Sequence, residues 1–289
     1  MKKVLMVLAG LFVALAGSAA DEHVESVISN VLACVQRIRA VDPNAVPMAF
    51  WDFDGTIIDG DISEGLPGAD GYKGMVETLI LSGKCGVYQG PAGVRQYFDR
   101  DYPRLNEIGR WVAWPYNAQI FAGARAAEIE ELTRMRCREI YSKFYFASSM
   151  EILRRLEAAG VENHIISASP EIWVKGTAES LGLPRERLNA IRVGIDGGRV
   201  TTEIIYPLPF GEGKVDVLRK IVLASPHAYP VAGFGNSYKT DAAFLKYIVE
   251  QRLPNQAKPF ALMINGFEPL PGYEGLFTCV EQRKRAGSR

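Results

Sequence analysis

The chain has 289 residues, of which 48% are hydrophobic, and its 33 basic residues balance its 33 acidic residues. This composition is typical of a globular protein and excludes an intrinsically disordered chain. The even charge gives no support to nucleic-acid binding, which calls for an excess of Lys and Arg.

The N-terminus has the layout of a secretory signal peptide. Lys2 and Lys3 precede an uncharged apolar run over residues 4–15, and Ser18-Ala19-Ala20 supply the small residues of a cleavage site. The run is shorter than the roughly 20 residues that span a bilayer, which disfavours an uncleaved anchor. We predict a signal peptide over residues 1–20 and a mature protein that is secreted or periplasmic, with no stable insertion in a membrane.

A predicted helix and a predicted strand follow. Residues 22–41 carry apolar side chains at steps of three and four, the period of an amphipathic helix. Residues 47–53 are mostly apolar or aromatic, as in a parallel strand covered on both faces. Because side chains alternate along a strand, Asp52 and Asp54 fall on one side near its carboxyl end, before a turn at Gly55. Two anions in one small space need a cation or a proton, although on this motif alone the aspartates could simply cap the turn.

The next part of the chain predicts an insertion. More than one hundred residues separate Thr56 from His164, too many for an ordinary connection between strands. Apolar residues at helical spacing predict helices over 74–81, 124–144 and 150–159. We predict a mainly helical cap over residues 61–147 and a core domain made of residues 21–60 and 148–289.

Short apolar strands and helices alternate after the insertion. The pattern predicts helices over 171–181, 214–223 and 240–249, strands over 231–234 and 260–264, and a hairpin over 188–205. This alternation predicts an α/β fold with a doubly wound, mostly parallel sheet. In such sheets ligands bind beyond the carboxyl ends of the strands.

The four cysteines, Cys34, Cys85, Cys137 and Cys279, allow three disulfide pairings. Export would place them in an oxidising compartment, but their spacing does not choose a pairing. We prefer a Cys85–Cys137 bridge because both residues lie in the predicted insertion. Buried free thiols are the alternative.

Four stretches, in chain order, place polar residues at the ends of apolar segments. They are Asp52-Phe53-Asp54-Gly55-Thr56, the strand 164–169 with Ser167, the helix start Gly213-Lys214, and residues 231–241 with Asn236 and Asp241. Together they resemble the four motifs of the haloacid dehalogenase superfamily of phosphatases, in particular its phosphoserine phosphatase and phosphorylcholine phosphatase group. The resemblance implies a Rossmann-like core with an inserted helical cap.

The resemblance also implies roles for these residues. Asp52 would attack phosphorus and form an aspartyl-phosphate, and Asp54 would protonate the leaving group and later deprotonate water. Ser167 and Lys214 would bind the phosphoryl oxygens. The alternatives are a serine that only bonds at a strand end and a lysine that is solvated on its helix.

Magnesium is the cofactor that the resemblance implies, because it prefers hard oxygen ligands. Its ligands would be the Asp52 carboxylate, the Asp54 backbone carbonyl and a side chain of the fourth motif. Here the sequence departs from the common pattern, since Asn236 stands where an aspartate is usual and Asp241 follows at a longer spacing. Either residue could supply the third ligand.

The residues after the first motif bear on the substrate. Asp61 matches the position at which phosphoserine phosphatases carry an acidic residue that meets the substrate amine. Residues 61–64 also resemble the acidic segment of secreted phosphorylcholine phosphatases. Asp61 and Glu64 could therefore hold an amine or choline group, with a cation-π face from Trp111, Trp114 or Tyr116. In the alternative, Glu64 is solvated and the tryptophans pack within the cap.

These patterns together predict a secreted, Mg²⁺-dependent hydrolase of small phosphate monoesters. One alternative, prompted by Asn236, is an exported protein that binds phosphate esters with little or no catalysis. A second is a phosphomutase on the same fold. A dehalogenase is disfavoured, because in the family pattern dehalogenases lack the second aspartate, Asp54.

Overall fold

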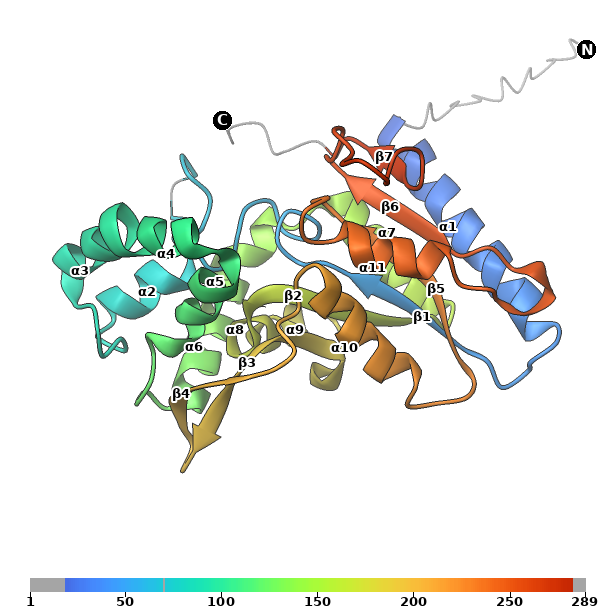
Figure 1. The fold of residues 1–289 in the computed structure, drawn as a ribbon. Helices are drawn as coiled ribbons and strands as arrows, with labels where there is room; N and C mark the ends of the chain where they lie inside the picture. Colours follow the sequence, from blue (N-terminus) through green and yellow to red (C-terminus); the bar gives the residue numbers. More distant parts are fainter. Residues whose placement is uncertain (1–18, 70, 283–289) are drawn as a thin grey trace, which may run out of the picture.

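The structure is a computed structural model that describes residues 19–69 and 71–282 (Figure 1). The predicted α/β class is confirmed, because seven strands form one sheet in the order β4-β3-β2-β1-β5-β6-β7. All neighbouring strands are parallel except the antiparallel pair β3 and β4. The strands are β1 Val46–Trp51, β2 Glu162–Pro170, β3 Leu188–Asp196, β4 Arg199–Ile205, β5 Ala228–Gly235, β6 Phe260–Ile264 and β7 Thr278–Val280.

Strand β1 lies at the centre of the sheet, between β2 and β5. Its side chains alternate between two hydrophobic clusters, with Met48 and Phe50 in one and Ala49 and Trp51 in the other. The strand is therefore buried on both faces, as its continuous apolar sequence predicts. Trp51 also stacks on Phe234 of β5, with ring centroids 3.6 Å apart.

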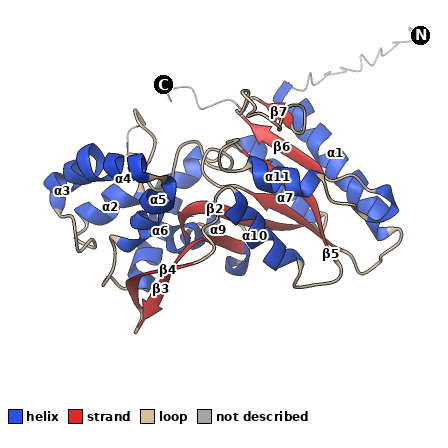
Figure 2. Ribbon diagram, viewed as in Figure 1, coloured by secondary structure: helices blue, strands red, loops and turns tan. Residues whose placement is uncertain are grey.

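Helices cover both faces of the sheet (Figure 2). The predicted N-terminal helix is α1, Ala19–Arg39, which packs beside α7, Ala147–Ala158. The helices α10, Glu212–Val222, and α11, Ala242–Val249, pack together and cover the hydrophobic cluster that contains Met48 and Phe50. The remaining short helices of the core are α8 Glu171–Gly176, α9 Ala178–Leu181, η3 Arg185–Arg187 and η4 Pro254–Gln256.

A group of helices lies between β1 and β2 in the chain and to one side of the sheet in space (Figure 1). The two passages that join it to the sheet run side by side, because Asp59 N–H donates to the Phe144 carbonyl at 2.8 Å and Phe146 N–H donates to the Ile57 carbonyl at 2.8 Å. The group contains α2 Met75–Leu81, α3 Gly90–Gln96, η1 Tyr97–Asp101, α4 Tyr102–Ile108, α5 Arg110–Gln119, α6 Ala126–Glu139 and η2 Tyr141–Phe144.

The inserted helices also attach to the β3–β4 hairpin. Gly123 N–H donates to the Val200 carbonyl at 2.8 Å, and Val200 N–H donates to the Ala124 carbonyl at 2.9 Å. The Gln119 side chain donates to the Thr202 carbonyl at 2.8 Å. The insertion is thus held to the sheet at two separate places.

The expected Cys85–Cys137 bridge is wrong, because all four cysteines are free thiols. The Cys85 thiol donates to the Ile120 carbonyl at 3.1 Å, whereas the Cys137 sulfur lies 3.0 Å from the hydroxyls of both Tyr145 and Ser180. Cys85 and Cys137 thus have separate partners, and the alternative of free thiols holds.

Residues 1–18 of the predicted signal peptide lie outside the described residues. Its last two residues, Ala19 and Ala20, belong to α1. Among the helices of residues 19–69 and 71–282, we find none with the length and apolar character needed to cross a membrane.

Candidate active site

A cavity of about 240 Å³ lies at the carboxyl end of β1. Asp52 follows the last residue of that strand, and its N–H donates to the carbonyl of Phe234 on β5 at 2.8 Å. The chain then turns at Gly55, whose φ of +74° favours glycine. The residues that line the cavity are Asp52, Asp54, Asp61, Ser63, Glu64, Tyr102, Arg110, Trp114, Asn117, Ala168, Ser169, Asn236, Ser237 and Thr240.

The Asp52 carboxylate is fixed by a hydrogen bond to each oxygen. The Lys214 ammonium donates to Oδ1 at 2.6 Å, and the Thr56 hydroxyl donates to Oδ2 at 2.9 Å. Burial and the nearby charge of Asp241 raise the pKa of Asp52 to about 6, although Lys214 opposes the shift. The carboxylate therefore has one orientation and a charge that a cation at the cavity would stabilise.

Lys214 lies behind Asp52 with no exposed surface. Its ammonium also donates to Oδ1 of Asp241 at 2.8 Å. Burial lowers the pKa of Lys214, but the charges of Asp241 and Asp52 outweigh burial, and the net pKa is raised. The lysine is therefore held as a cation between two carboxylates.

Asp54 faces the cavity from the loop after β1. Its Oδ1 accepts from the N–H of Ile62 at 2.7 Å, and its Oδ2 accepts from the hydroxyl of Ser169 at 2.7 Å. Burial and the charges of Asp61 and Asp52 raise the pKa of Asp54 well above its usual value. This carboxyl group is suited to carry a proton at a pH where an exposed aspartate has lost it.

The fourth motif contributes Asn236 to the cavity wall and Asp241 to its support. A Cβ atom placed on Gly55 would lie 2.0 Å from Nδ2 of Asn236, so the amide packs directly against the first motif. Both oxygens of Asp241 are occupied, one by Lys214 and the other by the N–H groups of Asn236 and Ser237 at 2.9 and 3.0 Å. Asp241 is fully buried and orders the loop that carries Asn236.

The cavity wall contains donors that suit magnesium. Asp52, Asp54 and Asn236 all line it and supply carboxylate, carbonyl and amide oxygens, the hard ligands that Mg²⁺ accepts. Within the described residues no group of three or more His, Cys, Asp or Glu side chains is arranged to hold a metal ion. A magnesium site here would therefore have a mixed set of ligands.

The structure brings most of the sequence-predicted residues together. Asp52, Asp54, Asp61, Glu64 and Asn236 line the cavity. Ser167, Lys214 and Asp241 are adjacent but fully buried, and none of them lines it.

The three aromatic candidates for the substrate site differ in position. Trp114 lines the cavity, and the guanidinium of Arg110 lies 4.9 Å from its ring centroid. Trp111 is 62% exposed and is not part of the wall. The hydroxyl of Tyr116 lies 2.9 Å from that of Tyr88 within the insertion.

The acidic segment 61–64 is shaped by Asp61, whose Oδ1 accepts from the N–H groups of Ser63 and Glu64 at 2.6 and 3.0 Å. Burial raises the pKa of Asp61. The Glu64 side chain is exposed; partial desolvation and the charge of Asp61 raise its pKa, while the Tyr102 hydroxyl opposes the shift. An added cation would stabilise both carboxylates.

Sequence reasoning missed several residues of the wall. Ser169 was a missed donor to Asp54, although strand alternation puts it on the same side as Ser167. Arg110 was also missed; it lies four residues before Trp114, which was predicted, and this spacing would have placed both on one helix face had α5 been predicted. Tyr102 and Asn117 left no such signal.

Comparison with known proteins places this geometry in context. A family model described as haloacid dehalogenase-like hydrolase matches residues 49–246. A search of curated proteins found no match to the chain.

Solved structures share the fold at low identity. A protein of unknown function from Bordetella pertussis Tohama I is 17% identical with a TM-score of 0.61, and the match covers 82% of this chain and 99% of that one. A functionally unknown protein from Anaerococcus prevotii DSM 20548 is 15% identical with a TM-score of 0.60, covering 86% and 87%. Cytosolic 5'-nucleotidase IIIB bound to cytidine is 14% identical with a TM-score of 0.52, covering 86% and 80%.

Proposed function

The chain belongs to the haloacid dehalogenase-like hydrolase family, and we propose that it is a Mg²⁺-dependent phosphatase that hydrolyses small phosphate monoesters. The observation that carries this proposal is the pair of carboxylates at the end of β1, with Lys214 2.6 Å behind Asp52 and Ser169 2.7 Å from Asp54. The pair supplies a nucleophile and a separate acid in one cavity.

In the first step, a carboxylate oxygen of Asp52 attacks phosphorus, and the bond from phosphorus to the ester oxygen breaks. Asp54 gives its proton to the departing oxygen, which its raised pKa allows. In the second step, Asp54 removes a proton from water as the water oxygen attacks phosphorus. The bond from phosphorus to Asp52 then breaks, which releases phosphate and restores both carboxyl groups.

Lys214 and Ser167 support this chemistry from beneath the surface. Lys214 keeps Asp52 ionised and adds positive charge behind the phosphoryl group, where negative charge develops in the transition state. The Ser167 hydroxyl accepts from Ser169 N–H at 3.0 Å and lies 3.4 Å from Asp54 Oδ2. We propose that Ser167 orients Ser169, which contacts Asp54 and faces the cavity.

Magnesium would be held by the Asp52 carboxylate, the Asp54 carbonyl and the Asn236 side chain. When bound, the ion would neutralise negative charge between the nucleophile and the phosphate. We assign the third ligand to Asn236 because Asn236 lines the cavity, whereas Asp241 is fully buried and does not. Asp241 acts through Lys214 and the Asn236 loop.

We propose that the substrate carries an amine, such as phosphocholine or phosphoserine. Asp61 and Glu64 place negative charge in the cavity, and Trp114 offers an aromatic face beside them. The helical insertion would serve as the cap that selects the substrate, since Tyr102, Arg110 and Trp114 belong to it. Export to the periplasm or the medium is part of the same proposal.

The decisive experiment is turnover of p-nitrophenyl phosphate with Mg²⁺ by the purified protein. We expect hydrolysis by the wild type, loss with EDTA, and loss of at least about a thousandfold in Asp52→Asn, because the nucleophile is gone. Asp216→Asn, an exposed change on α10, should match the wild type. Tight binding of phosphate esters without turnover would favour the binding-protein alternative, and transfer of phosphate to a second hydroxyl in place of water would favour a mutase.

A further inference from the structure

A line of buried hydrogen bonds runs from the C-terminal part of the structure to Asp52. Gln282 Nε2 donates to the hydroxyl of Ser149 at 2.7 Å, and that hydroxyl donates to the Thr56 carbonyl at 2.7 Å. The Thr56 hydroxyl completes the line by donating to Asp52 Oδ2 at 2.9 Å. Thr56 and Ser149 have no exposed surface, and Gln282 is 5% exposed.

The sheet itself positions Gln282. Strand β7 pairs with β6, and Asn265 at the end of β6 donates its N–H to the Val280 carbonyl at 2.8 Å. The side chain of Asn265 then accepts from the N–H of Gln282 at 2.8 Å. The chain beyond β7 is therefore fixed at the point where it reaches the first turn of α7, which contains Ser149.

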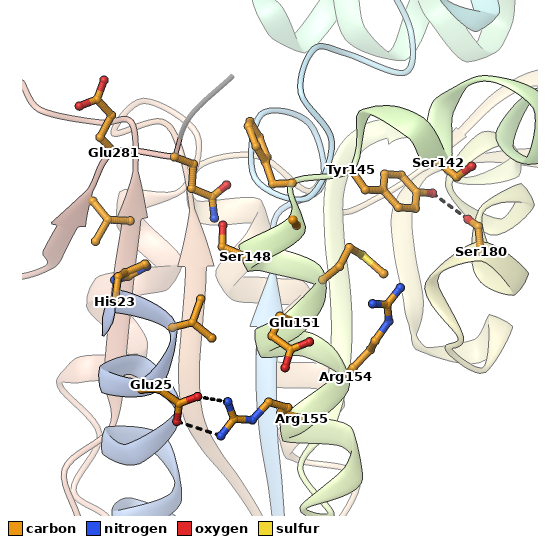
Figure 3. Close-up of a pocket in the computed structure, with 16 residues that line it drawn as sticks. His23, Glu25, Ser142, Tyr145, Ser148, Glu151, Arg154, Arg155, Ser180 and Glu281 are labelled. Carbon is orange, nitrogen blue, oxygen red and sulfur yellow. Dashed lines mark hydrogen bonds and ion pairs between the residues drawn. The ribbon is translucent and has the colours of Figure 1, made fainter. Parts of the chain in front are cut away.

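Gln282 also borders a cavity of about 1200 Å³ between α1 and α7. Figure 3 shows His23 and Glu25 of α1 on one side of this cavity and Ser148, Glu151 and Arg155 of α7 on the other. The Gln282 carboxamide oxygen is buried without a hydrogen-bond partner among the described residues. Burying an acceptor without a partner costs free energy. The hydrogen bond from Nε2 to Ser149 offsets part of this cost.

We propose that Ser149 is a positioning residue for the nucleophile, and that Gln282 holds Ser149 in place. The proposal rests on the proposed role of Asp52. The bond from Ser149 restrains the Thr56 carbonyl, and this restraint helps to keep the Thr56 hydroxyl directed at Oδ2 of Asp52. Small displacements of a reacting oxygen reduce the rate strongly, so a bond remote from the cavity affects the reaction.

The first test compares Ser149→Ala with Ser148→Ala, its neighbour on α7, whose side chain has no hydrogen bond within the described residues. We expect Ser149→Ala to lower kcat/KM for p-nitrophenyl phosphate about fivefold to tenfold, the effect of one hydrogen bond. The inhibition constant of orthovanadate, which mimics the transition state, should rise by the same factor, while that of inorganic phosphate stays constant. Ser148→Ala should change none of these values.

Inhibition constants do not depend on the fraction of active protein, so a variant that is merely less stable leaves both of them unchanged. Gln282→Met, which removes the donor but keeps the size, should shift the orthovanadate constant in the same direction by a smaller factor. Because both residues act through one line of bonds, the double variant should equal Ser149→Ala alone. Additive effects, or an unchanged orthovanadate constant in Ser149→Ala, would overturn the proposal.

Hydrogen exchange separates this inference from the proposed function. Ser149→Ala should speed amide exchange in residues 53–60 relative to the wild type and to Ser148→Ala, whether or not the protein turns over phosphate esters. If the wild type is inactive but Ser149→Ala still speeds exchange in this loop, the phosphatase proposal is refuted and the positioning of Asp52 is supported. Unchanged exchange in Ser149→Ala would refute the positioning.

Discussion

At the scale of single residues, the site concentrates negative charge. Asp54 lies near Asp52 and Asp61 at the cavity, and its carboxyl group accepts hydrogen bonds from the Ile62 N–H and the Ser169 hydroxyl and a longer one, at 3.4 Å, from the Ser167 hydroxyl. Burial is the main cause of its raised pKa, and the two neighbouring carboxylates add to it. Asp54, which keeps a proton in the proposed mechanism, is therefore costly to ionise in the folded protein.

This cost predicts a pH-dependent gain of stability in Asp54→Asn. A carboxyl group whose pKa is raised by folding stabilises the protein below its unfolded pKa of about 4, and this stability is lost as pH rises through the folded pKa. Asparagine has the same shape and no charge. In EDTA, the melting temperature of the variant should be close to that of the wild type near pH 4. The variant's melting temperature should exceed that of the wild type by a growing margin as the pH rises toward 8, as measured by thermal denaturation.

The control for this experiment is Asp216→Asn, an exposed change on α10, whose melting temperature should follow the wild type at every pH. If the difference in melting temperature between Asp54→Asn and the wild type stays constant from pH 4 to pH 8, ionisation of Asp54 does not destabilise the folded protein. The same variant should have lost most of its turnover, since the stabilised form lacks the acid.

Gly55 shows how one missing side chain shapes the site. A Cβ atom at this position would lie 2.0 Å from Nδ2 of Asn236, and the φ of +74° adds backbone strain. Gly55→Ala should displace the Asn236 amide and abolish most of the rise in melting temperature that Mg²⁺ gives the wild type. Thermal denaturation over a Mg²⁺ titration measures this.

Gly198→Ala separates the two effects of that substitution. Gly198 has a similar φ of +77°, and a Cβ atom there would have no neighbour within 4 Å. Both variants should lose about 1 kcal/mol of stability from the backbone alone, but Gly198→Ala should keep the full response to Mg²⁺. A full response in Gly55→Ala would remove Asn236 from the ligand set.

At the scale of elements, the core could be predicted because its patterns are local. The continuous apolar run of β1, the hairpin over 188–205 and strand 260–264 all appear in the structure. Their signals are apolar runs, alternation of apolar and polar residues, and turn residues, all of which reflect local backbone structure. Asp52 follows the end of β1 and Lys214 lies in the first turn of α10, and the two side chains meet although 162 positions separate them.

The insertion was harder to predict. Helices α3, α4 and α5 contain Pro91, Pro103 and Pro115, and Gly109 breaks the chain between the last two helices, so no long apolar period extends over residues 90–119. Strand β7 has only three residues, too few for an alternation signal. The boundaries predicted for the cap, 61–147, stay a prediction.

Part of the site was also beyond sequence reasoning. Which motif residues are buried and which line the cavity depends on tertiary packing. Lys214 and Asp241 contact each other beneath the cavity, whereas Asn236 lines it. Tyr102, Arg110 and Trp114 enter the wall from helices whose placement depends on packing. The line from Gln282 to Thr56 joins residues that no motif connects.

At the scale of the whole molecule, the cavity is shared between the sheet and the inserted helices. Glu64 is at the start of the insertion, where its solvent-exposed side chain lines the cavity beside Asp61. A cationic substrate group would be attracted by these two neighbouring carboxylates. Glu64→Gln should raise KM for phosphocholine about fivefold to tenfold, the effect of losing one charged contact, and leave KM for p-nitrophenyl phosphate unchanged.

Steady-state kinetics with both substrates measure this difference. Glu107→Gln, an exposed change on α4 outside the cavity wall, is the matched control and should alter neither constant. An equal rise of KM for both substrates in Glu64→Gln would assign the residue to phosphate binding or to folding, and would contradict a site for the amine.

The side-by-side passages at Ile57–Asp59 and Phe144–Phe146 have an evolutionary consequence. A polypeptide that leaves a scaffold and returns at almost the same point can be lengthened, trimmed or exchanged there, because the entropy of closing such a loop changes slowly with its length. A different helical module could be grafted between these passages with every strand still in register. One chemistry could thus be inherited unchanged while descendants diverge in what they accept.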